Sequence, residues 1–116
     1  MPVDFVPLSP AQDALAARHC LPGAPRLADD GLREHLGTLT GWRDAGDRLE
    51  KTYRFSDFHE TVGFLNALAW IANREDHHPD LTVSYNRCVV AWSTHDAGGV
   101  TESDVVCAAK TDRLLG

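Results

Sequence analysis

The chain has 116 residues, of which 43% are hydrophobic and 24% charged, values that are ordinary for a single globular domain. This composition excludes an intrinsically disordered chain and a fibrous repeat. The formal net charge is −6 and the basic residues are scattered, so the chain lacks the clustered cations that nucleic-acid binding needs.

The cysteines Cys20, Cys88 and Cys107 are odd in number and widely spaced, and none belongs to a CxxC pair. We therefore interpret them as reduced, mostly buried thiols rather than as a disulfide framework or a zinc knuckle. Residues 1–10 lack the basic and apolar regions of a signal peptide, and no stretch has the apolar length of a membrane span. We expect a cytoplasmic protein that does not bind a membrane.

Residues 1–27 are predicted to form an N-terminal extension ahead of a domain over residues 28–116. Ser9 and Gln12 have the spacing of a capping box, which predicts a short helix through about Ala17. Alanines make up most of its apolar face, so we expect this helix to dock weakly.

The domain is predicted to open with a helix that begins after Asp29 or Asp30 and ends at Gly41. A hairpin follows, with strands at residues 42–43 and 49–55.

The clearest pattern is a second helix that runs to about residue 74. Ser56 or Asp57 caps it, and Asp57 with Glu60 has capping-box spacing. Phe58 and Phe64 belong to its apolar stripe, so we expect both in the core.

Two more strands are predicted at residues 81–85 and 88–94. Thr101 and Asp104 then open a last helix through about Leu115. The element order is α-β-β-α-β-β-α. It predicts an α+β fold, in which three main helices pack on one face of a four-stranded antiparallel sheet.

Three of the six histidines lie at two element boundaries. His77 and His78 precede the third strand, and His95 follows the fourth. If these strands form a hairpin, all three histidines lie at one end of the sheet, near Asp104 in the first turn of the last helix.

Three interpretations of this group remain open. Imidazoles near a carboxylate suit metal-free general acid–base catalysis, and they also suit a metal site. In the third interpretation the residues are structural: Pro79 favours an extended backbone at His78, and Asp104 caps its helix.

The run DHHPDLTVSYNRCVVAWSTHDAGGVTESD, residues 76–104, resembles the signature of the pterin-4a-carbinolamine dehydratase family. The pattern combines a His-His-Pro, an aromatic residue (Tyr85), a histidine at the end of the next strand, and an aspartate beyond a glycine loop. The resemblance implies loss of water from a 4a-hydroxytetrahydropterin to give the quinonoid dihydropterin, without a metal or another cofactor.

The resemblance also implies roles for eight residues. The acid–base set is His77, His78 and His95, with His78 and His95 expected to be the most sensitive. Asp76, Ser93, Thr94 and Asp96 are expected to line the pterin pocket, and Asp104 to orient a histidine or the pterin. One position departs from the family: Asn73 stands where a charged or ionisable side chain, often glutamate, is usual.

The resemblance further implies a homodimer or homotetramer, with an aromatic amino-acid hydroxylase as a candidate partner. A non-catalytic binding, assembly or coactivator-like protein on the same scaffold is the alternative function. A metal-dependent hydrolase is the third hypothesis.

Overall fold

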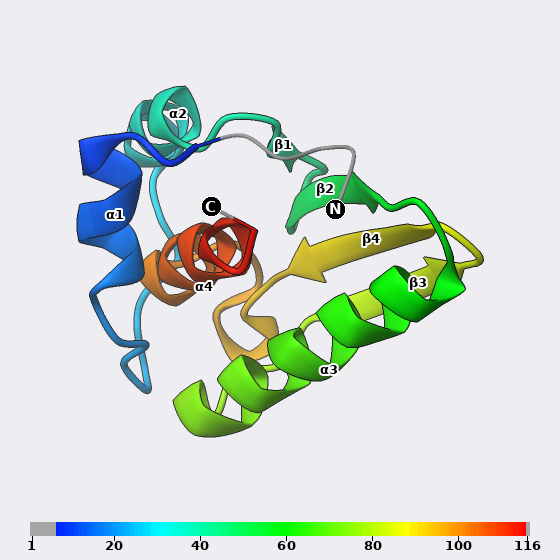
Figure 1. Ribbon diagram of the computed structural model, residues 1–116. Coiled ribbons are helices and arrows are strands. Elements are labelled where there is room, and N and C mark those ends of the chain that lie inside the picture. Colours follow the sequence, from blue (N-terminus) through cyan, green and yellow to red (C-terminus); the bar gives the residue numbers. More distant parts are fainter. Residues whose placement is uncertain (1–6, 116) are drawn as a thin grey trace.

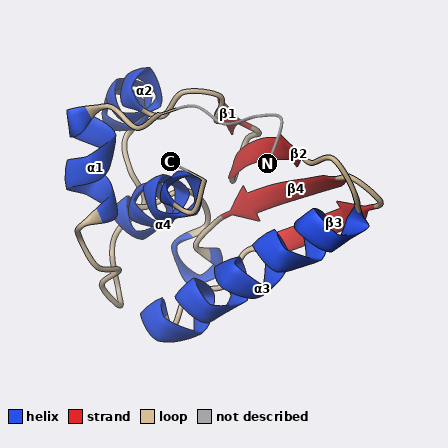
Figure 2. Cartoon of the chain, viewed as in Figure 1, coloured by secondary structure: helices blue, strands red, loops and turns tan. Residues whose placement is uncertain are grey.

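The computed structural model describes residues 7–115, which form one antiparallel sheet and four α-helices (Figures 1 and 2). The elements in chain order are α1 (Pro10–Ala16), α2 (Asp29–Thr38), β1 (Arg43–Asp44), β2 (Leu49–Arg54), α3 (Phe58–Glu75), β3 (Asp80–Ser84), β4 (Arg87–Trp92), the 3-10 turn η1 (His95–Ala97) and α4 (Glu102–Arg113). Within these residues no helix is both long and apolar enough to cross a membrane.

The sheet has the strand order β1-β2-β4-β3, with every neighbouring pair antiparallel. Two hairpins therefore lie side by side, joined by pairing of β2 with β4. The register places Asp80 opposite Ala91, so the start of β3 and the end of β4 share one end of the sheet. The predicted α+β fold class is confirmed.

The predicted capping boxes fix the starts of two helices. The Ser9 hydroxyl accepts a hydrogen bond from the Gln12 backbone N–H at 3.2 Å, and α1 begins at Pro10. The Asp57 carboxylate accepts from the Glu60 backbone N–H at 2.9 Å, and α3 begins one residue later. Side-chain acceptors at these ends satisfy N–H groups that have no partner inside the helix.

The core lies between the sheet and helices α3 and α4 (Figure 1). Alternation along β4 sends Cys88, Val90 and Trp92 to one face, where all three are fully buried. Phe64 of α3 packs among them, as predicted.

The prediction that Phe58 lies in the core is wrong. Its side chain is 51% exposed and stacks on the exposed Tyr85, with ring centroids 6.3 Å apart. Thr61 occupies the buried position in this part of α3, and its hydroxyl donates to the Tyr85 carbonyl at 3.0 Å. The buried stripe of α3 therefore begins one turn later than the apolar pattern suggests.

Helix α1 packs on α4, on the side away from α3 (Figure 1). Leu15 and Ala16 are buried there. Polar contacts add to this small apolar face, because the Lys110 ammonium donates to the Ala16 carbonyl at 2.8 Å and the buried Gln12 amide donates to Asp112 at 3.4 Å. The weak docking expected from an alanine face is thus supplemented by hydrogen bonds.

Asp112 is a buried carboxylate that joins α4 to the first hairpin. It accepts hydrogen bonds from Trp42 Nε1 at 3.0 Å, Tyr53 Oη at 2.5 Å and Lys51 Nζ at 2.7 Å. Burial and the neighbouring carboxylate together hold the pKa of Tyr53 well above its usual range. The phenol therefore stays protonated and donates to Asp112.

Candidate active site

A cavity of about 290 Å³ lies at the end of the sheet where β3 starts and β4 ends. Four separate parts of the chain form it: the end of α3 with the turn after it, the segment after β4, the loop that follows α1, and the first turn of α4. Its lining residues are Cys20, Leu21, Pro22, Gly23, Glu75, Asp76, His77, Thr94, Asp96 and Ser103.

Asp104 does not line this cavity, but its carboxylate contacts two residues that do, His77 and Thr94. Its carboxylate is fully buried in the first turn of α4, and one oxygen lies 2.5 Å from His77 Nε2. The other oxygen accepts from the Thr94 hydroxyl and from the Thr101 backbone N–H, each at 2.8 Å. A carboxylate at a helix N-terminus is also favoured by the helix dipole. Asp104 therefore caps α4 and orients His77 at the same time.

The His77 imidazole is fixed on its face as well as at Nε2. It stacks on the fully buried Trp92 ring, with centroids 5.5 Å apart and planes 12° from parallel. The hydrogen bond to Asp104 raises the pKa of His77, against an opposing contribution from burial. The site thus favours an imidazolium at His77 in a single orientation.

His78 and His95 are exposed, and neither belongs to the lining of the cavity. His78 Nε2 lies 3.1 Å from the Asn73 amide oxygen. An amide oxygen only accepts, so this pairing places a hydrogen on Nε2 and leaves Nδ1 of the neutral ring as the acceptor. His95 begins η1 between Thr94 and Asp96, which do line the cavity.

The structure thus brings together four of the predicted site residues, Asp76, His77, Thr94 and Asp96, with Asp104 as their buried support. The other three, His78, Ser93 and His95, lie outside the lining of this cavity.

The turn between α3 and β3 depends on a left-handed residue. Asp76 has φ 52° and ψ 42°, and it is the one described non-glycine residue of positive φ. The next N–H, that of His77, donates to the Ala72 carbonyl at 3.1 Å, which closes the helix with a Schellman-type bond. This reversal directs the chain into the cavity wall immediately after α3.

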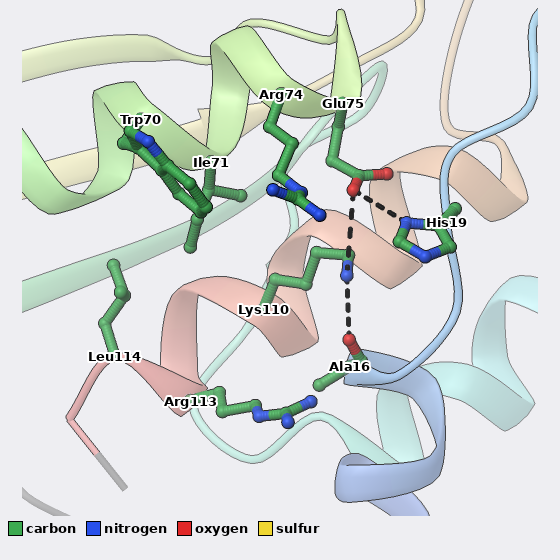
Figure 3. Close-up of a pocket in the computed structure, with 9 residues that line it drawn as sticks. All are labelled: Ala16, His19, Trp70, Ile71, Arg74, Glu75, Lys110, Arg113 and Leu114. Carbon is green, nitrogen blue, oxygen red and sulfur yellow. Dashed lines mark hydrogen bonds and ion pairs between the residues drawn. The ribbon is translucent and has the colours of Figure 1, made fainter.

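The sequence did not predict that part of the N-terminal extension, residues 20–23, lines the cavity. Glu75 holds it in place: its carboxylate accepts from the Cys20 backbone N–H at 2.8 Å and lies 2.9 Å from His19 Nδ1 (Figure 3). The Lys110 ammonium is 3.8 Å from the same carboxylate. Although burial opposes it, these partners hold the pKa of Glu75 below its usual value. The contacts span more than fifty residues of chain, so no local sequence signal predicts them.

Glu75 also lines a second cavity of about 270 Å³ between α1, α3 and α4 (Figure 3). The exposed Trp70 lines this second cavity, with the Arg74 guanidinium 5.1 Å from its ring centroid. None of the eight predicted site residues lines it. Across residues 7–115, no group of three or more histidine, cysteine, aspartate or glutamate side chains is arranged to hold a metal ion.

Comparison with known proteins gives relatives over most of the chain. A Chromobacterium violaceum protein that carries the name pterin-4-alpha-carbinolamine dehydratase is 58% identical over 98 residues, which cover 83% of this chain and 91% of the relative. A Xanthomonas oryzae pv. oryzae protein of the same name is 50% identical over 116 residues, covering 96% of this chain and 92% of the relative. The second alignment includes most of the N-terminal extension.

Two solved structures share the fold. A crystal structure described as a transcriptional coactivator/pterin dehydratase from Brucella melitensis has a TM-score of 0.75 and 35% identity, covering 78% of this chain and 99% of that one. A pterin dehydratase-like protein described as a RuBisCO assembly factor in the alpha-carboxysome has a TM-score of 0.57 and 26% identity, covering 66% of this chain and 90% of that one.

The family model described as pterin 4 alpha carbinolamine dehydratase matches residues 25–114, which include the predicted histidines, Asp104 and the whole sheet. On this match and on the relatives, the chain belongs to the pterin 4 alpha carbinolamine dehydratase family of hydro-lyases.

Proposed function

We propose that the protein removes water from 4a-hydroxytetrahydropterin to give the quinonoid dihydropterin, with His77, His78 and His95 as the acid–base set. One observation carries the proposal. His77 is held by the buried Asp104 at the wall of a cavity that Asp76, Thr94 and Asp96 also line. That arrangement presents an oriented imidazole beside carboxylates and a hydroxyl.

The reaction needs two proton transfers and no redox change. The leaving hydroxyl at C4a takes up a proton, and the adjacent ring nitrogen loses one. An imidazolium donates and a neutral imidazole accepts near neutral pH, so a set of histidines supplies both functions. His77, whose pKa is raised, suits the donor form, and His78 has an accepting Nδ1. Interacting histidines titrate together, so we assign the two functions to the set rather than to single rings.

We propose that Asp76, Ser93, Thr94 and Asp96 bind the pterin. The amino group and ring N–H of a pterin are adjacent donors, which a carboxylate oxygen pair can accept together. Asp76 and Asp96 line the cavity from two different chain segments, and we propose that one of them accepts from this part of the ring. The volume of about 290 Å³ is at the lower end of the range for small-molecule sites and suits a bicyclic heterocycle.

The test is a direct dehydration assay on 4a-hydroxytetrahydropterin that compares the wild type with His78→Ala and His95→Ala. We expect each substitution to lower kcat by roughly 10²–10⁴-fold, the contribution of one positioned proton donor or acceptor. His59→Ala, an exposed histidine near the start of α3, is the matched control and should retain full activity. Unchanged rates in both His78→Ala and His95→Ala would reject the proposed acid–base set.

A binding, assembly or coactivator role on the same scaffold is the second candidate. The neighbour described as a RuBisCO assembly factor favours it, because a related fold there serves protein assembly. A wild-type protein that does not accelerate dehydration above the uncatalysed rate would favour this second role.

We further propose that the protein acts in the cytoplasm as a homodimer or homotetramer. An unpaired sheet edge supports self-association: β3 is an edge strand, and Val83 and Tyr85 in and beside it are exposed. Sedimentation equilibrium over a range of protein concentrations tests the oligomeric state, and a monomer at all concentrations would contradict it.

A further inference from the structure

Two thiols from distant parts of the chain meet beside the candidate site. Cys20 follows α1 and Cys107 lies in α4, 87 residues away, yet their sulfur atoms are 2.9 Å apart. Both are free thiols. Their separation is shorter than ordinary contact between two sulfur atoms, and a shift of about 1 Å would bring them to the length of a disulfide bond.

The two sulfurs have different environments. The hydrogen bond with Cys107 lowers the pKa of Cys20, with burial opposing it and the positive charge of His77 and of Lys110 adding to the lowering. The same hydrogen bond, together with burial, raises the pKa of Cys107 far above its ordinary value. Of the two sulfurs, Cys20 is therefore the one that loses its proton more readily, and as a thiol it also donates to the Ser103 carbonyl at 3.4 Å.

The two thiols also differ in access. Cys20 is half-buried and lines the cavity of about 290 Å³, so this residue is the one of the pair that a small solute in the cavity approaches first. Cys107 is fully buried behind it. This is the arrangement of an attacking thiol with a resolving thiol.

We propose that Cys20 and Cys107 form an oxidation site, at which hydrogen peroxide converts the two thiols into an intramolecular disulfide. The Cys20 sulfur attacks one peroxide oxygen and the O–O bond breaks. The departing hydroxide takes a proton to become water, which leaves a sulfenic acid on Cys20. The Cys107 sulfur then attacks the Cys20 sulfur, the S–O bond breaks, and the leaving hydroxide takes the Cys107 proton. In total, two thiols lose two electrons and two protons, and one peroxide is reduced to two waters.

The remaining cysteine is an internal control. Cys88 is fully buried in β4, where burial raises its pKa to about 11. Its sulfur is therefore neither ionised near neutral pH nor open to the cavity, and it should stay reduced.

The experiment exposes the full-length protein to hydrogen peroxide and then counts thiols by alkylation under denaturing conditions, with intact-mass and peptide mapping. We expect loss of two of the three thiols, a mass about 2 Da lower, a Cys20–Cys107 cross-linked peptide, and reversal by dithiothreitol. The oxidised form should also unfold at a higher Tm, because the new bond closes a long loop. Three free thiols after exposure, a cross-link through Cys88 or between chains, or a sulfinic acid on Cys20 with Cys107 still free would each overturn the proposal.

Three variants separate the steps. Cys88→Ser should oxidise as the wild type does. Cys107→Ala should stop at a Cys20 sulfenic acid that dimedone traps, and Cys20→Ser should lose no thiols to peroxide. The wild-type peptide map decides the question even if a core variant fails to fold, and its outcome does not depend on the proposed dehydratase activity.

Discussion

His77 and Asp104 form the contact that joins the cavity to the core, with Nε2 of the imidazole 2.5 Å from a fully buried carboxylate oxygen. Because Asp104 also receives hydrogen bonds from Thr94 and Thr101, its carboxylate ties the end of α3, the end of β4 and the start of α4 together. A change of charge at His77 therefore affects both the site and the stability of the fold.

The first prediction concerns the pH dependence of stability. A histidine whose pKa is raised in the folded state stabilises the fold below the unfolded pKa of about 6.5, and this contribution is lost as pH rises through the raised value. The unfolding free energy of the wild type should therefore exceed that of His77→Gln by about 1–2 kcal/mol near pH 5.5. The difference should shrink towards zero as the imidazole deprotonates, because both residues then offer a neutral donor.

Urea unfolding at a series of pH values measures this difference. His59→Gln, a substitution of the same kind at an exposed histidine, is the matched control. A His77→Gln difference that stays constant or grows with pH would contradict the assigned His77–Asp104 pair.

The second prediction concerns the buried carboxylate of Asp112. Removing it in Asp112→Ala leaves the buried donors of Trp42 and Tyr53 and the partly buried Lys51 ammonium without their common acceptor. We expect a loss of about 3–5 kcal/mol in the free energy of unfolding. Asp47→Ala, in the exposed hairpin turn, should change it by less than about 0.5 kcal/mol. Equal effects from the two substitutions would show that the Asp112 network does not stabilise the fold.

The third prediction concerns Asn73, the amide 3.1 Å from His78 Nε2. In Asn73→Glu a carboxylate replaces the amide oxygen as the acceptor of the Nε2 hydrogen, which makes the accepting Nδ1 of His78 a stronger base. We expect dehydration to become severalfold faster, because the ring then takes up a proton more readily. Asn66→Glu, exposed on the same helix, adds the same charge away from His78 and should leave the rate unchanged. A rate that is equal in both variants would mean that charge next to His78 does not limit turnover.

The fourth prediction concerns the wall that Glu75 holds in place. In Glu75→Ala the Cys20 backbone N–H and the His19 ring lose their acceptor, so the segment at residues 20–23 is released from the cavity. We expect the KM for the pterin to rise severalfold, with a smaller effect on kcat, because in the proposed site this wall would contact the substrate away from the proposed acid–base histidines. Glu102→Ala also removes a carboxylate that joins the extension to α4, through Arg18, and that pairs with His35, but Glu102 does not line the cavity. It should leave KM unchanged, and a rise in KM in both variants would point to general loosening of the extension.

The sequence predicted those parts of the molecule that depend on neighbouring residues. Capping boxes placed the starts of α1 and α3 correctly, and alternation identified the buried face of β4. The hairpin geometry correctly placed the approach to β3 at the same end of the sheet as the end of β4.

Contacts between distant segments could not be predicted in this way. The Glu75 contacts with the extension, the Cys20–Cys107 pair and the Asp112 network link residues far apart in the chain, and no period or motif encodes them. Phe58 illustrates the converse error, because helical spacing identifies an apolar stripe and does not show where the partner surface ends.

Asp76 illustrates a compromise between folding and chemistry. A residue with a Cβ in the left-handed region costs about 1 kcal/mol relative to glycine, the residue best suited to end a helix in this way. Glycine at this position would relax the backbone. It would also remove a carboxylate from the cavity wall, where Asp76 and Asp96 are the two carboxylates of the proposed pterin-binding set. Under the proposed function, the most stable version of this turn would therefore be a poorer receptor for a hydrogen-donating ring, and Asp76 provides an acceptor in the cavity wall at a cost of about 1 kcal/mol in stability.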